Sequence, residues 1–197
     1  YDEVSELKKI DKVADVTPYT TISATLSKGG TKSSGTSLIG AGASYTKMMG
    51  YELEYGRDLS PIDVKNCIKA VVIGNGIADK FWNKKNPCGS TLKIDGDDYT
   101  VVGVLKSAGS SMGNNIDKTV IMPLPTAKFL GADTSITELY LRADSEDSVN
   151  AATKNVKKYF KDVKHMGSDY VDVYSQKQMQ ESMEEINKTL SLLLGGI

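Results

Sequence analysis

Histidine and cysteine are scarce in this chain, which limits the chemistry available to it. Its 197 residues include one histidine, His165, and two cysteines, Cys67 and Cys88. His165 stands among lysines at the end of a predicted helix, where we interpret it as a solvated cation and not as a catalytic base. One histidine and two distant cysteines do not supply the usual zinc ligands. We therefore expect no catalytic centre, no metal and no cofactor in this chain.

The two cysteines are also too few for a disulfide scaffold. We interpret Cys88 as a small apolar side chain that packs in the core. The alternative is a Cys67–Cys88 disulfide, which an extracellular compartment would permit.

Long apolar segments are absent except at the end of the chain. The run from Leu190 to Ile197 stops where the sequence stops, whereas a bilayer-spanning helix needs ~20 apolar residues. The first residues, Tyr1-Asp-Glu-Val, are polar and do not resemble a signal peptide. We expect the chain to be part of a longer protein.

Neither positive nor negative charge is in excess, because the chain has 24 Lys and Arg residues and 25 Asp and Glu residues. The sequence has no basic stripe of the kind that binds nucleic acid, so nucleic acid is not an expected partner. The length suits one large domain or two small ones and is sufficient to bury a core.

Two motifs suggest ligands that we do not expect. Gly74-Asn75-Gly76 follows a predicted strand and opens a helix, as a dinucleotide fingerprint does, but Asp79 replaces its third glycine. The run from Asp95 to Asp98 hints at calcium, yet the twelve-residue loop and terminal glutamate of an EF-hand are missing. We interpret the first motif as a strand-to-helix turn and the second as a hairpin turn.

The periodicity of the chain predicts an α+β fold. Alternating apolar residues predict a strand at 13–26, a second strand returns at 36–41, and further strands are predicted at 70–74, a buried-looking apolar run, and at 99–104. From Thr137 the pattern becomes strand, helix and strand, with Val149, Ala152 and Val156 on one helix face and a returning strand at 170–174.

The last predicted helix carries the most regular pattern. Its apolar residues recur at steps of four, three, four and three: Met179, Met183, Ile186, Leu190 and Leu193. An apolar stripe that repeats every 3.5 residues is typical of a helix that packs along a partner helix. An amphipathic helix docked on its own domain remains the alternative.

Six short motifs occur here in a specific order. They are Leu38-Ile39-Gly40, Gly56-Arg57-Asp58, Val72-Ile73-Gly74, Asn86-Pro87-Cys88-Gly89, Tyr99-Thr-Val-Val-Gly-Val104 and Val120-Ile121-Met122-Pro123-Leu124. In this order they resemble the extracytoplasmic (periplasmic) core domain of MacB-like and FtsX-like ABC-transporter permeases.

The resemblance assigns structural roles to six residues: Gly56, Arg57, Gly74, Pro87, Gly89 and Gly103. We expect Arg57 to pair locally and hold its turn, and not to bind a ligand. At least one ring of the aromatic pair Phe81-Trp82 should be buried against the strand Val101-Val102-Gly103-Val104.

The resemblance also implies an architecture. A porter-like α/β subdomain would combine residues 1–55 and 136–178, with a β-rich, sabre-like insertion at 56–135. Residues 179–197 would form a stalk helix that leads into a transmembrane span. Val4 and Leu7 would lie on the helix that continues from a preceding span.

The function implied is that of an ABC-transporter permease domain on the extracytoplasmic side of the cell membrane. It would be non-catalytic and would couple ATP-driven motion to export or to an envelope partner. A separate ATP-binding subunit or domain would supply the energy. The permease would be dimeric, and its substrate would be an exported peptide or a lipid-like molecule. The alternatives are an FtsX-like regulatory permease that activates a cell-wall hydrolase, and a free-standing extracellular binding module.

Overall fold

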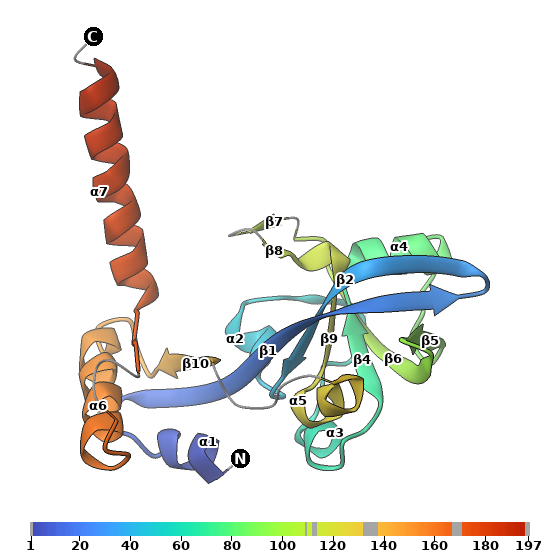
Figure 1. Ribbon diagram of the computed structural model, residues 1–197, viewed down its shortest axis with the longest axis horizontal. Helices are drawn as coiled ribbons and strands as arrows, with labels where there is room; N and C mark the ends of the chain where they lie inside the picture. The colour runs from blue at the N-terminus through green and yellow to red at the C-terminus, as the bar shows by residue number, and fades with distance from the viewer. Residues whose placement is uncertain (1, 109, 112–113, 132–137, 167–170, 196–197) are drawn as a thin grey trace. The chain divides into compact units, whose positions relative to one another are not determined.

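The computed structural model describes residues 2–108, 110–111, 114–131, 138–166 and 171–195 (Figure 1). The chain forms two compact units. The sheet unit is Val16–Tyr140, and the terminal unit combines Tyr1–Asp15 with Leu141–Ile197. The predicted porter-like and sabre-like subdomains have their boundaries at other residues, and that division stays a prediction.

Strands and helices are both present, which confirms the predicted α+β class. The strands are β1 (Val13–Lys28), β2 (Thr31–Ala41), β3 (Leu53–Gly56), β4 (Ala70–Ile73), β5 (Thr91–Ile94), β6 (Asp97–Leu105), β7 (Ser110–Ser111), β8 (Asn114–Asn115), β9 (Thr119–Pro123) and β10 (Glu138–Ala143). The helices are α1 (Asp2–Leu7), α2 (Tyr45–Met48), α3 (Pro61–Lys65), α4 (Asn75–Trp82), η1 (Ile116–Lys118), α5 (Leu124–Ala127), η2 (Lys128–Leu130), α6 (Val149–Asp162) and α7 (Gln176–Gly195).

The main sheet is mixed, with strand order β10-β1-β2-β9-β4-β6-β3, and β5 pairs with β1 and β6. Strand β4 is central and runs parallel to β6 but antiparallel to β9. All four of its residues are buried. Val71 and Ile73 enter one apolar cluster while Ala70 and Val72 enter another, because successive side chains point to opposite faces. A strand covered on both faces therefore reads as an unbroken apolar run.

The predicted hairpin at Asp95-Gly96 is confirmed. These two residues join β5 to β6 and both have positive φ, 48° and 97°. A two-residue turn of this kind matches the right-handed twist of the flanking strands. The Asp95 carboxylate also accepts a hydrogen bond from the Thr25 amide at 2.8 Å, which fixes the turn beside β1.

The predicted returning strand at 170–174 is wrong for the residues that the structure describes. Residues 171–174 form no strand, and Tyr174 is exposed. Tyr170 lies outside the described residues. Alternation of apolar residues is weak support for a strand, because pairing also requires a neighbour with a free edge.

In the terminal unit, α6 buries Ala152 and Val156 as the periodicity predicts. Contacts from Glu6 connect α1 to this part of the chain. The Glu6 carboxylate accepts a hydrogen bond from the Tyr159 hydroxyl and forms an ion pair with Lys164 at 3.2 Å. Leu7 is buried, so α1 is anchored in its own unit by both packing and charge.

Candidate functional site

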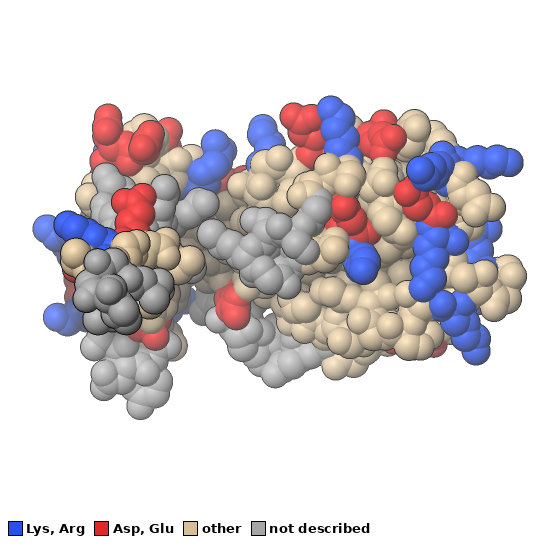
Figure 2. Space-filling view, turned by 90° about the horizontal axis from the view of Figure 1, so that it is seen from above, with Lys and Arg blue, Asp and Glu red and all other residues tan. Residues whose placement is uncertain are grey.

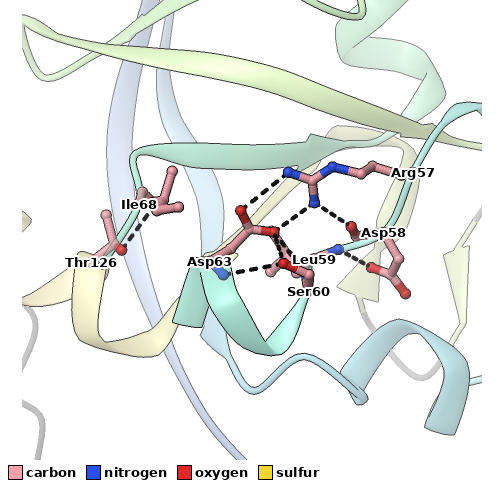
Figure 3. A network of polar contacts seen from close by, with 7 residues as sticks. All are labelled: Arg57, Asp58, Leu59, Ser60, Asp63, Ile68 and Thr126. Atoms are coloured by element: carbon pink, nitrogen blue, oxygen red, sulfur yellow. Dashed lines mark hydrogen bonds and ion pairs between the residues drawn. The ribbon is translucent and has the colours of Figure 1, made fainter. Parts of the chain in front are cut away.

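The Gly56-Arg57-Asp58 turn forms the most connected polar network in the sheet unit (Figure 3). The Arg57 guanidinium contacts the Asp63 carboxylate through two nitrogens, Nη1–Oδ2 at 2.5 Å and Nη2–Oδ1 at 3.1 Å. Asp63 lies in the first turn of α3, where the Ser60 hydroxyl caps the helix and accepts a hydrogen bond from the Asp63 amide. The prediction that Arg57 pairs locally is confirmed.

Asp63 is held in its charged form. The hydrogen bonds from Arg57, helped by those from Ser60, lower the pKa of Asp63 to about 2 from its usual 3.8, against the effect of burial. The same contact raises the pKa of Arg57. A carboxylate with so low a pKa is a weak base near neutral pH, and its contacts with Arg57 join the turn to the start of α3.

Asp58 extends the network toward α2. One of its carboxylate oxygens accepts a hydrogen bond from the Thr46 hydroxyl, and the other accepts one from the Leu59 amide at 2.7 Å. On the far side of α3, the Thr126 hydroxyl donates to the Ile68 carbonyl at 3.2 Å (Figure 3). Side chains therefore connect the turn to α2 and α3, and a separate hydrogen bond connects α5 to the segment between α3 and β4.

The glycines of the family motifs lie where the backbone leaves no space for a side chain. A Cβ atom on Gly56 would lie 2.2 Å from the Val102 carbonyl oxygen, and one on Gly103 would lie 2.3 Å from the Arg57 carbonyl oxygen. Gly89 has a φ of +82° and follows the buried Pro87. Their family roles stay predictions, and the geometry accounts for the residue type at Gly56 and Gly103.

The nucleotide-like motif has a packing explanation. Gly74 precedes α4, and a Cβ atom there would lie 2.1 Å from the Ile116 carbonyl oxygen. A Cβ atom on Gly76 would lie 2.9 Å from the Asp117 carbonyl oxygen. The start of α4 therefore packs against the carbonyl groups of η1, in the place where a dinucleotide fold would receive phosphate.

The aspartates near the β5–β6 hairpin are engaged in other contacts. Asp97 pairs with Lys69 at 3.2 Å and Asp98 with Lys93 at 2.8 Å. Within the part of the chain that the structure describes, no three His, Cys, Asp or Glu side chains gather as metal ligands do. His165 is exposed.

Cys67 and Cys88 are both free thiols, so the disulfide alternative is not supported. Cys88 packs against the core cluster that includes Val101 and Val104, as its apolar interpretation requires. Phe81 and Trp82 pack against the same cluster as expected, but both are only partly buried, so the prediction that one of them is buried is wrong.

The predicted stalk residues fall in two helices. Val4 is half-buried and Leu7 buried in α1, whereas Met183, Ile186 and Leu190 of α7 are 62%, 55% and 49% exposed. Met179 and Leu193 belong to α7, but their side chains lie outside the described residues. Among the described residues, no helix combines the length and the apolar character that crossing a bilayer requires.

Sequence analysis did not identify Asp63 as the partner of Arg57. The signal was present, because Ser60-Pro61-Ile62-Asp63 has the spacing of a capping box followed by an apolar residue. A carboxylate at that position lies in the first turn of a helix, within reach of the preceding arginine.

Comparison with known proteins agrees with this geometry. The family described as the MacB-like periplasmic core domain matches residues 1–159. A macrolide export ATP-binding/permease protein MacB from Chlorobium luteolum is 27% identical over 172 residues, which are 85% of this chain and 26% of that protein. The corresponding protein of Neisseria gonorrhoeae is 25% identical over 197 residues, all of this chain and 30% of that protein. The chain thus spans less than a third of the length of these relatives.

Two solved structures share the fold. The periplasmic region of MacB from Actinobacillus actinomycetemcomitans has a TM-score of 0.79 at 20% identity, covering 93% of this chain and 81% of that one. The extracellular domain of the noncanonic ABC-type transporter YknZ, from Gram-positive bacteria, has a TM-score of 0.70 at 20% identity, with 84% of each chain covered. With a family match over most of its length, this chain belongs to the MacB-like periplasmic core domain family.

Proposed function

We propose that this chain is the extracytoplasmic domain of an ABC-transporter permease and that it couples ATP-driven motion to export. In this proposal a separate ATP-binding subunit or domain hydrolyses ATP on the other side of the membrane. The permease is dimeric, and the domain itself carries no catalysis. Its family membership and the relationship to ATP-binding/permease proteins support the proposal.

The apolar stripe of α7, a helix whose described side chains from 182 to 192 are all exposed, is the observation that carries the coupling role. Twenty helical residues extend ~30 Å, and Met183, Ile186 and Leu190 lie along one side of this helix with about half or more of each side chain exposed. Exposed apolar side chains at helical spacing indicate a surface that a partner helix covers. We infer that this partner is the helix that continues upstream of Val4.

The contacts of α1 support the same role. Because Leu7 is buried and Glu6 contacts Tyr159 and Lys164, a displacement of α1 would be passed to the region around α6. Motion of this type is a rigid-body transition, which needs a stiff connection between the moving helix and the domain.

The test is a set of cysteine pairs in the full-length transporter. Val4→Cys is combined in turn with Met183→Cys, Ile186→Cys or Leu190→Cys, in a background with Cys67→Ser and Cys88→Ala. Complete oxidation of the pair that cross-links should abolish export, and reduction should restore it. The single-cysteine variants under the same oxidant are the controls. Full export with the cross-link complete would contradict the coupling role.

A second candidate function is an FtsX-like regulatory permease that acts on a cell-wall hydrolase. It is favoured by Ile62 and Phe129, which are 64% and 62% exposed on the sheet unit. A contiguous patch of exposed apolar side chains is typical of a site that binds another protein, and in this proposal Ile62 of α3 and Phe129 of η2 contribute to such a patch. Replacing both by serine in the whole permease should then remove hydrolase activation, whereas a pure exporter should retain its export rate.

A further inference from the structure

Lysine side chains gather at one end of the sheet unit, where Figure 2 shows blue atoms over the region of the β1–β2 hairpin and α4. Two segments far apart in the sequence supply them. The hairpin contributes Lys28 and Lys32, and the end of α4 with the turn that follows contributes Lys80, Lys84 and Lys85. We call these five residues the lysine cluster.

Two contacts hold the segments together. The Lys80 ammonium donates a hydrogen bond to the Ser33 hydroxyl at 2.9 Å, from α4 to β2. The Lys28 ammonium lies over the Trp82 ring, 5.1 Å from its centroid. The cluster is therefore a feature of the tertiary structure and not of one charged stretch.

The lysines of the cluster differ from others of the sheet unit in their contacts, although Asp79 and Glu54 line the same hollow as Lys84 and Lys85. None of the five lysines forms an ion pair with a carboxylate in the described part of the chain, whereas Lys69, Lys93 and Lys106 all do. The net charge of the whole chain is only −1. A concentration of positive charge on a nearly neutral protein attracts an acidic surface and raises its association rate.

The turn after α4 has an unusual backbone. Asn83 and Lys84 both have positive φ, 51° and 63°. Residues other than glycine rarely adopt this conformation, and such residues concentrate at binding sites and switch regions. The conformation directs the chain back from the end of α4 and brings Lys84 and Lys85 to the wall of a hollow beside β3.

This hollow has a volume of about 240 Å³. Buried Val104 and Ala78 are among the residues that line it, together with Lys84, Lys85, Asp79 and Glu54. Glu54 already accepts a hydrogen bond from the Asn75 amide, so one of the two acidic groups has a partner. Small-molecule sites typically measure ~300–1,000 Å³, so the hollow suits one side chain and not a whole drug-sized ligand.

We propose that the lysine cluster binds an acidic, extended segment of a partner protein that passes beside Lys84 and Lys85. Strand β3 forms the edge of the sheet next to the hollow, where an extended segment can lie along its free side. The cluster consists of lysine, a point charge without the bidentate geometry of arginine, which suits carboxylates in varied positions. The inference rests on the proposed function in one respect, which is that the partner lies on the extracytoplasmic side of the membrane.

Trp82 makes the test direct, because it is the one tryptophan of the chain and its ring lies under Lys28. The probe is a twelve-residue peptide that alternates glutamate and serine, and its neutral control alternates glutamine and serine. Titration of the 197-residue chain with the glutamate peptide should change Trp82 fluorescence saturably. Binding should weaken as sodium chloride rises from ~50 to ~500 mM, because salt screens exposed charges.

Two triple variants that lose the same charge distinguish binding at the lysine cluster from an effect of the net charge of the protein. The triple variant Lys80→Gln, Lys84→Gln, Lys85→Gln should bind the peptide at least about tenfold more weakly. The control Lys157→Gln, Lys158→Gln, Lys161→Gln removes the same charge from exposed positions of α6. It should leave the dissociation constant within about twofold.

Three outcomes would overturn the proposal: no saturable change with the glutamate peptide, equal binding of the glutamine peptide, or equal weakening in both triple variants. Flotation with phosphatidylglycerol vesicles tests the alternative that the lysine cluster binds an anionic lipid surface. Vesicle binding through the cluster without peptide binding would assign the site to lipid and contradict the proposal. Since the measurement uses no transport assay, its failure leaves the coupling role of α7 unaffected, and failure of the cross-linking test leaves this site unaffected.

Discussion

Arg57 and Asp63 form a bidentate ion pair in which only Arg57 is exposed to water. The Asp63 side chain is 3% exposed and that of Arg57 53% exposed, with nitrogen–oxygen distances of 2.5 Å and 3.1 Å. The pair joins the Gly56-Arg57-Asp58 turn to the start of α3. Its loss would leave a buried carboxylate with only the Ser60 hydrogen bonds.

Arg57→Ala should lower the free energy of unfolding by about 1–3 kcal/mol, the cost of leaving a buried polar group without a partner. Arg57→Lys keeps the charge but loses the second contact, so its cost should be smaller. Urea denaturation measures both. Arg142→Ala, an exposed arginine on β10, is the matched control and should stay within about 0.5 kcal/mol. An Arg57→Ala protein as stable as this control would contradict a stabilising role for the pair.

The stability of the sheet unit should fall in acid because of Asp63. Its pKa is about 2 in the folded chain and about 3.8 without the fold. Since the folded pKa is the lower one, the stabilisation is fully present above pH ~4 and is lost as the pH falls through ~2. The unfolding free energy should decrease by up to about 2 kcal/mol across this range.

Asp63→Asn removes the titrating group and should flatten that part of the pH profile. Urea midpoints measured at intervals from pH 5 to pH 2 provide the comparison. Parallel profiles for the two proteins would show that other carboxylates cause the acid sensitivity.

Phe81→Ala should destabilise the chain more than Phe129→Ala. Phe81 packs against the core cluster around Val101 and Val104, whereas Phe129 is 62% exposed. Truncating a fully buried aromatic ring costs ~3–5 kcal/mol, so the partly buried Phe81 should cost somewhat less. Phe129→Ala should change stability by less than about 0.5 kcal/mol. Thermal melts compare the two, and equal midpoints would contradict the packing of Phe81.

Gly56→Ala and Gly50→Ala separate steric crowding from backbone conformation. Both glycines have positive φ, +77° and +71°. Gly50 has open space around it, whereas a Cβ atom on Gly56 would lie 2.2 Å from the Val102 carbonyl oxygen and 2.6 Å from the Cys88 sulfur.

Gly50→Ala should therefore cost about 1 kcal/mol, from the left-handed conformation alone. Gly56→Ala should cost more than about 3 kcal/mol, because the backbone must also move. Soluble yield and urea midpoints measure the difference. Similar losses in the two variants would mean that conformation and not crowding determines the glycine at position 56.

Local signals in the sequence determined much of the secondary structure. The apolar run at β4, the Asp95-Gly96 hairpin and the buried face of α6 all follow from periodicity and turn chemistry, which act over a few residues. The order of the six motifs pointed to the family that the match over residues 1–159 shows. The helix α7 was also predicted from its apolar spacing, and the partner helix for its apolar residues stays a prediction.

Only the tertiary structure decided which distant groups meet. The returning strand at 170–174 failed because strand formation depends on an available neighbour, which no local pattern reports. The glycines at 56 and 103 are explained by carbonyl oxygens of other segments. The lysine cluster could not be read from the sequence, because Lys28 and Lys84 lie more than fifty positions apart and come together only where β1 and β2 pass the end of α4. Composition determines how much charge a chain carries, and long-range packing determines where that charge gathers.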